Sequence, residues 1–148
     1  MAELVREIMI DATPETIWPF LTDPEKHLEW LGSAVDIDPR PGGVYRVLMR
    51  GQFQSAGEYV EVVPNEKVVF TFGWEQDGHP IPAGSTTIEI SLQRDGDKTR
   101  VRLVHSGLPD DAVEDHRHGW EHYLNRLAIA ATGGNPGPDT APDDPATA

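Results

Sequence analysis

Three histidines lie within seven residues in the segment EDHRHGWEHY, which runs from residue 114 to 123. Imidazole side chains can bind a metal ion or transfer protons near neutral pH. At about 100° per residue of a helix, His116 falls at the edge of the apolar side, whereas His118 and His122 fall on the opposite side. Because the three rings point apart, we expect no metal site, a solvated position for His118 and His122, and a core-edge or capping role for His116.

His105 is the candidate for polar chemistry inside the fold. It continues the alternation of Val101 and Leu103, whereas Arg100, Arg102 and Val104 occupy the opposite phase of the strand. Because alternate residues of a strand share one face, we expect the His105 ring to point between the sheet and the C-terminal helix. There it could be a structural histidine at the strand end, bind a ligand, or act as an acid or base. We favour the first interpretation.

Glu58 is a possible carboxylate partner for His105. The segment GEYVEVV would turn Glu58 inward together with Val62 in one strand phase, and Tyr59 inward in the other. The sequence leaves both phases open. No third group completes a catalytic triad, and the chain has neither a phosphate-binding loop nor a zinc-protease motif. We therefore assign no catalytic residue and expect no cofactor.

Apolar and aromatic side chains dominate the positions that should face the same interior as His105. They could line a cavity for a small ligand or fill the space as a core, depending on how far the helix stands from the sheet. In this fold the two interpretations share one set of residues. The predicted ligand-binding residues are Trp30, Phe70, Phe72, Trp74, Leu103, His105, Trp120, Tyr123 and Leu124.

The elements that would position these residues follow from changes in hydrophobic period. We expect a first strand at residues 4–10. Thr13 as N-cap and Pro14 then begin a helix, which Pro19 should shorten or kink. A second short helix begins at Asp23 with Pro24 next. Alternating segments between residues 33 and 105, with a hairpin signal at RDGDK, indicate an antiparallel meander.

A long helix should close the folded part. Asp110 is the expected N-cap and Gly133 the expected end. The predicted fold is therefore α+β, with about six to seven strands curved around one C-terminal helix. We expect one domain over residues 1–132 and a disordered acidic tail over residues 133–148, because GGNPGPDTAPDDPATA has no large apolar side chain to bury.

Composition limits the function classes. The formal net charge of −13 argues against binding to nucleic acid or to an anionic membrane surface. The sequence has no cysteine, so thiolate chemistry and disulfides are excluded. We see no signal peptide and no apolar stretch near the ~20 residues that span a bilayer. These features suit a soluble cytoplasmic protein.

Several motifs together resemble one family. ATPETIW, DPRPGG, GEYVEVVPNEKVVFTF and GLPDDAVEDHRHGWEHYLNRL are similar to homologues of the activator of heat-shock protein 90 ATPase, within the START-like (SRPBCC) superfamily. The resemblance covers residues 4–131, nearly all of the expected domain. It implies the helix-grip fold, a curved sheet that wraps around a long helix. It implies function less sharply, because a fold does not carry one activity.

Three functions are compatible with the sequence. The first is binding of a small hydrophobic or aromatic ligand between the sheet and the C-terminal helix. The second is a co-chaperone-like interaction with a protein partner, which the family name implies. The third is an enzyme of the cyclase or dehydratase type that uses His105. We expect the first.

Overall fold

Seven antiparallel strands form one curved sheet in the computed structural model, which describes residues 2–137. The strand order is β1-β7-β6-β5-β4-β3-β2. The strands are β1 (Ala2–Ile10), β2 (Ala34–Ile37), β3 (Val44–Met49), β4 (Phe53–Val63), β5 (Lys67–Phe72), β6 (Thr86–Asp95) and β7 (Lys98–Leu108). This topology confirms the predicted α+β meander.

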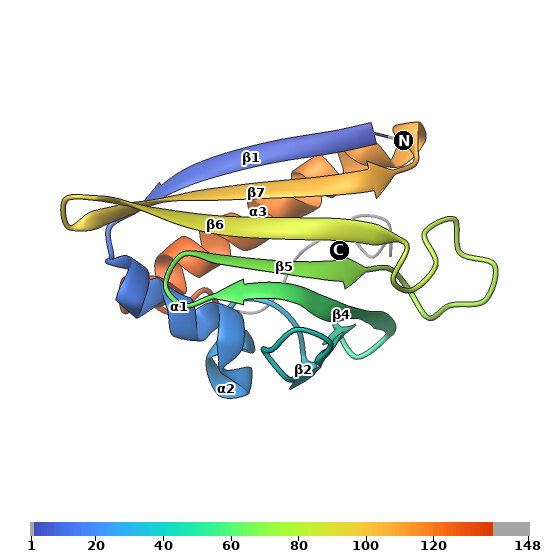
Figure 1. Ribbon diagram of the computed structural model, residues 1–148, viewed down its shortest axis with the longest axis horizontal. Helices are drawn as coiled ribbons and strands as arrows, with labels where there is room; N and C mark the ends of the chain where they lie inside the picture. Colours follow the sequence, from blue (N-terminus) through green and yellow to red (C-terminus); the bar gives the residue numbers. More distant parts are fainter. Residues whose placement is uncertain (1, 138–148) are drawn as a thin grey trace.

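Helices cover one face of the sheet. They are α1 (Pro14–Thr22), α2 (Pro24–His27), the 3₁₀ turn η1 (Asp110–Ala112) and α3 (Val113–Ala131). Figure 1 shows α3 running behind the sheet, with α1 and α2 at one end of the molecule and the long loop after β5 at the other. The arrangement is the helix grip that the resemblance implied. Among residues 2–137, no helix combines the length and the apolar character needed to cross a bilayer.

The strand faces follow the predicted alternation. In β7, Val101, Leu103 and His105 are fully buried, whereas Arg100 and Arg102 are exposed. The inward row of β7 lies beside that of β6, with His105 opposite Ile88 in the antiparallel register. His105 therefore points to the helix side of the sheet, as predicted. A register slip of one residue would have turned His105 and its whole row to the opposite face.

The phase of β4 was open from the sequence, and the structure resolves it. Tyr59 is 1% exposed and Glu58 lies on the outer face. The pairing with β5 shifts between Tyr59 and Glu61, so Val60 forms a bulge and is 53% exposed. Glu58 therefore does not face His105, and the possible carboxylate partner is excluded by geometry.

The first two helices begin as predicted. The Thr13 hydroxyl accepts a hydrogen bond from the Thr16 backbone N–H, and the Asp23 carboxylate accepts one from the Glu25 N–H. Pro19 lies inside α1, which still extends over nine residues. Proline lacks an N–H and so removes one helix hydrogen bond. The helix nevertheless continues to Thr22.

The start of α3 differs from the prediction. Asp110 does not cap the helix, because the chain first makes a tight 3₁₀ turn in which the Ala112 N–H donates to the Pro109 carbonyl. The helix then begins at Val113 without a side-chain cap. Its end is as predicted: Gly133 has a φ of +89°, and the N–H of the next residue returns to the Ile129 carbonyl.

The faces of α3 separate the three histidines. The buried residues of the helix are His116, Gly119, Trp120, Tyr123, Leu124, Leu127, Ala130 and Ala131. His118 is exposed and His122 is half-buried. The helix lies closest to β1, and an ion pair of 3.1 Å joins Arg6 of that strand to Glu121. Side chains must therefore fill the wider space below β5, β4 and β3.

The first residues of the predicted tail contact the helix. Arg126 donates from Nε to the Trp30 carbonyl (3.1 Å) and from its guanidinium to the Gly137 carbonyl (3.0 Å). Residues 138–148 lie outside the described part of the chain. The domain boundary after residue 132 and the disorder of the tail stay predictions.

Candidate functional site

His105 lies at the centre of a buried hydrogen-bond network between β7, β6 and α3. The Trp120 Nε1–H donates to His105 Nδ1 (3.0 Å), so Nδ1 carries no proton. A neutral imidazole then has its proton on Nε2, which lies 2.9 Å from the Thr86 hydroxyl. The Thr86 hydroxyl in turn donates a hydrogen bond to the Phe72 carbonyl (2.7 Å). Both ring nitrogens are therefore engaged within the protein.

The surroundings keep the His105 ring neutral. Burial, and after it the charge interaction with His116, lower the pKa of His105 to about 3. The two rings meet edge to face with centroids 5.3 Å apart. A general base needs a free lone pair and a pKa near the working pH. The arrangement is that of a structural histidine, which was the interpretation favoured from the sequence.

The nine predicted ligand-binding residues all lie in the interior. Each is at most 6% exposed. Close ring contacts fill much of the space around them: Phe70 stacks on Tyr45 with centroids 4.0 Å apart and meets Tyr59 at 6.1 Å. The assignment of the nine residues to a ligand site stays a prediction, and their tight packing restricts where such a ligand could enter.

His27 belongs to this interior, although sequence analysis did not single it out. Its Nδ1–H donates to the Leu31 carbonyl (2.9 Å), and its Nε2 accepts from the Tyr45 hydroxyl (2.9 Å). Burial lowers the pKa of His27 to about 4. The spacing of His27, Trp30 and Leu31 at i, i+3 and i+4 is the helical signal that could have revealed it.

A surface pocket of about 340 Å³ lies at the end of the sheet beside the loop after β5. The turn between β3 and β4 forms one wall and the start of the loop forms the other. The lining residues are Gln52, Phe53, Gln54, Trp74, Glu75 and Gln76. Only Trp74 had been predicted from the sequence. The other five come from two segments that are distant along the chain, and no local pattern brings them together.

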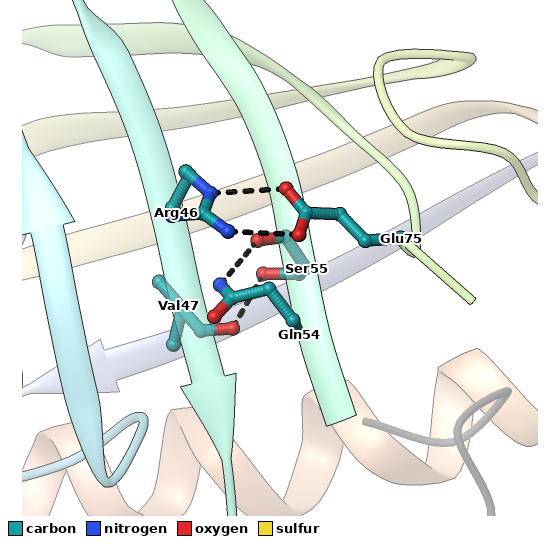
Figure 2. A network of polar contacts seen from close by, with 5 residues as sticks. All are labelled: Arg46, Val47, Gln54, Ser55 and Glu75. Atoms are coloured by element: carbon teal, nitrogen blue, oxygen red, sulfur yellow. Dashed lines mark hydrogen bonds and ion pairs between the residues drawn. The ribbon is translucent and has the colours of Figure 1, made fainter. Parts of the chain in front are cut away.

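An ion pair joins the loop wall of this pocket to β3. Arg46 of β3 donates from Nε and from a terminal nitrogen to the two carboxylate oxygens of Glu75, at 3.0 and 2.8 Å. Figure 2 shows this paired contact beside two further bonds: the Gln54 amide donates to the Ser55 carbonyl within β4, and the Ser55 hydroxyl donates to the Val47 carbonyl of β3. The Glu75 backbone N–H also donates to the Gln54 carbonyl (2.9 Å). Backbone and side chain together fix the loop to the sheet.

Trp74 connects the pocket with the interior. It lines the pocket, yet only 2% of its surface is exposed. Its buried Nε1–H has no hydrogen-bond partner within residues 2–137. Its ring meets Phe72 with centroids 5.3 Å apart, and Phe72 in turn meets His105 at 5.4 Å. A chain of rings thus leads from the pocket wall to the buried histidine network.

Comparison with known families gives one match, which covers residues 11–132: the family described as activator of Hsp90 ATPase homolog 1-like protein. The chain belongs to this family. The match covers most of the described fold and agrees with the resemblance seen in the sequence motifs. A comparison with curated proteins gave no significant match.

Solved structures agree with the family assignment. An AHSA1-like protein from Rhizobium etli is 39% identical, with a TM-score of 0.74 and coverage of 97% of this chain and 89% of that one. A protein from Mesorhizobium loti is 22% identical (TM-score 0.80; 88% and 97% covered). The Aha1 dimer from Colwellia psychrerythraea is also 22% identical (TM-score 0.78; 90% and 98% covered). The last two support the fold alone.

This member of the activator-of-Hsp90-ATPase homologue family has its histidines dispersed. Within residues 2–137, no group of three or more histidine, aspartate or glutamate side chains is placed to hold a metal ion. His105 and His116 lie inside and His118 lies outside. The pocket at Trp74 and the ring chain behind it are the candidate binding features that adjoin the predicted interior residues.

Proposed function

We propose that the protein binds a small, largely apolar ligand in the pocket at Trp74. The observation that carries this proposal is the lining of the pocket, in which the Phe53 and Trp74 rings lie together with three glutamine side chains. The Trp74 indole N–H is itself buried, so it offers no hydrogen bond to a ligand in the pocket.

The size and lining of the pocket suit a small molecule. Its volume of about 340 Å³ lies within the ~300–1,000 Å³ typical of ligand sites. The Phe53 and Trp74 rings offer apolar surface, and three glutamine side chains offer polar groups that can orient a ligand. This mixture of an apolar wall with a few polar groups is typical of binding sites.

The pocket also adjoins the predicted interior site. Trp74 belongs to both, and Phe72 lies between Trp74 and His105. A ligand could bind at the surface end of this chain of rings without displacing the packed core. The proposal therefore keeps the small apolar ligand expected from the sequence. It places that ligand in the surface pocket at Trp74, not between the sheet and α3.

The alternatives have less support on the described surface. A co-chaperone role would need a contiguous docking face. The exposed large apolar side chains within residues 2–137 lie apart on β1, after α2, on β4 and on α3: Val5, Met9, Leu28, Val60 and Ile129. An enzyme that uses His105 would need a free imidazole nitrogen, and both are hydrogen-bonded.

The proposal is tested by titration with prodan, an uncharged naphthalene ketone whose emission shifts to the blue in an apolar site. We expect saturable binding to the wild-type protein. Phe53→Ala removes one ring from the wall and should weaken binding by about tenfold, because burying an aromatic ring against the ligand contributes on the order of 1.4 kcal/mol.

Ile129→Ala is the matched control, since Ile129 is an apolar side chain that is 44% exposed on α3. It should leave the prodan affinity unchanged. Absence of saturable binding, or equal effects of Phe53→Ala and Ile129→Ala, would overturn the proposed function.

A further inference from the structure

We infer that the loop between β5 and β6 opens when His79 is protonated, so that acidic pH removes one wall of the pocket at Trp74. The loop comprises residues 73–85 and projects from the end of the sheet opposite α1 and α2 (Figure 1). It supplies three of the six lining residues of the pocket, Trp74, Glu75 and Gln76. The opening follows from contacts inside the loop and needs no ligand. Its consequence for binding rests on the proposed function.

His79 closes the loop by accepting a backbone hydrogen bond. The Ile81 N–H donates to His79 Nδ1 at 2.9 Å. Residues 80 and 82 are prolines, which have no N–H, so Ile81 carries the only backbone donor of residues 80–82. The closed form of this segment therefore depends on an acceptor that belongs to an ionisable ring.

Ile81 also lies where the two arms of the loop meet. Its side chain is 1% exposed, and its carbonyl accepts a hydrogen bond from the Trp74 backbone N–H (2.9 Å). The arms touch at the neck of the loop, because a Cβ at Gly73 would overlap the Pro82 carbonyl oxygen. Loss of the bond at the Ile81 N–H therefore weakens the contact between the arm that carries Ile81 and the arm that carries Trp74.

Protonation converts the acceptor into a donor. In the closed loop the neutral ring of His79 offers Nδ1 to the Ile81 N–H, so its own proton is on Nε2. A protonated imidazole has an N–H at both nitrogens, and two donors would then face each other. The Ile81 N–H loses its partner whether the ring turns away or the loop opens.

The charges around the loop favour the protonated ring. Residues 73–85 carry two acids, Glu75 and Asp77, and Arg46 of β3 is paired with the first of them. The residues of β4 that hydrogen-bond to the loop, Gln54 and Ala56, are uncharged. The ring itself is half-buried beside the Trp74 ring, with centroids 6.0 Å apart. Attraction to the acids thus assists protonation.

Hydrogen exchange of the Ile81 backbone amide tests the opening without any ligand. Its protection factor is measured by NMR at pH 7.5 and 5.5, which corrects for the intrinsic effect of pH on exchange. An imidazole in water is half-protonated near pH 6.5, so we expect the protection of Ile81 to fall about tenfold between these two pH values.

His79→Asn is the matched variant, because an asparagine side chain can accept the N–H two residues on and does not titrate. In this variant the protection of Ile81 should change by less than about twofold. His79→Ala removes the acceptor at any pH, so Ile81 should be weakly protected at both pH values. Leu103, buried in β7 between β1 and β6, reports global unfolding and should stay better protected than Ile81 at pH 5.5.

Equal falls in the wild type and in His79→Asn would overturn the inference, and so would an Ile81 amide as well protected as Leu103 at pH 5.5. Prodan titration then tests the consequence for the pocket: the affinity should fall from pH 7.5 to 5.5 in the wild type and stay unchanged in His79→Asn. If the loop opens but the prodan affinity does not fall, the inferred control of the pocket is wrong. If prodan does not bind at pH 7.5, the proposed function is wrong, whereas the exchange result still decides whether His79 opens the loop.

Discussion

Lowering the pH from 7 to 5 should reduce the free energy of unfolding by about 4 kcal/mol through two buried histidines alone. Burial lowers the pKa of His27 to about 4 and that of His105 to about 3, against 6.5 for an unperturbed histidine. The unfolded chain therefore binds protons as the pH falls below about 6.5, while both folded rings stay neutral. Stability from these groups is complete above pH 6.5 and decreases toward the folded pKa values, by about 2 kcal/mol for each ring at pH 5.

Denaturant unfolding at a series of pH values between 5 and 7.5 measures this slope. His27→Gln removes one of the two titrating rings and should reduce the loss of stability to about half. A flat profile between pH 7 and 5 in the wild type would show that the two histidines are not held neutral.

Leu124→Ala should lower the free energy of unfolding by about 3 kcal/mol. Leu124 is 2% exposed on the face of α3 that packs beneath the sheet. Its truncation loses buried apolar surface and leaves a cavity, a combination that costs ~2–5 kcal/mol in protein cores.

Ile129→Ala on the same helix is the matched comparison, because Ile129 is 44% exposed and loses little packing on truncation. It should cost within about 0.5 kcal/mol apart from small propensity effects. Chemical denaturation of both variants at pH 7.5 gives the two values. Similar costs for the two substitutions would mean that α3 does not present its Trp120 face to the sheet.

Strand phases were predictable where alternation was unbroken. Val101, Leu103 and His105 alternate with arginines, and only one phase keeps those arginines in water. The phase at Glu58 could not be predicted, because apolar residues follow it in both alternating rows of the strand. The bulge at Val60 then shifts the alternation by one residue. A bulge is a property of strand pairing, and single-strand periodicity does not report it.

The helix starts show the same limit. Thr13 and Asp23 cap their helices because their side-chain oxygens accept a backbone N–H of the first turn, and each is followed by proline at the first helical position. Asp110 follows a proline instead, and the chain tightens into a 3₁₀ turn before α3 begins. The residue types at 110–112 suit both a capped α-helix and a 3₁₀ turn, so the local sequence does not distinguish the two.

The candidate site was only partly predictable. The sequence identified Trp74 and the apolar interior from their period. The pocket also needs Gln52 and Phe53 from one turn and Glu75 and Gln76 from a loop, and Arg46 joins them across 29 positions of sequence. The closed network around His105 depends on the distances to Trp120 and Thr86, which residue order does not specify.

The most direct test of ligand binding at Trp74 follows the four tryptophan indole N–H signals in a ¹⁵N–¹H spectrum during a prodan titration. Trp30 and Trp120 donate to protein acceptors, the Phe20 carbonyl and His105, so their signals are internal references. Trp74→Phe assigns the Trp74 signal. The account predicts a saturable change in the position of that signal, because a ligand in the pocket lies against the Trp74 side chain, while the signals of Trp30 and Trp120 stay in place. A Trp74 signal that does not move while prodan binds, or shifts confined to the other indoles, would contradict the account.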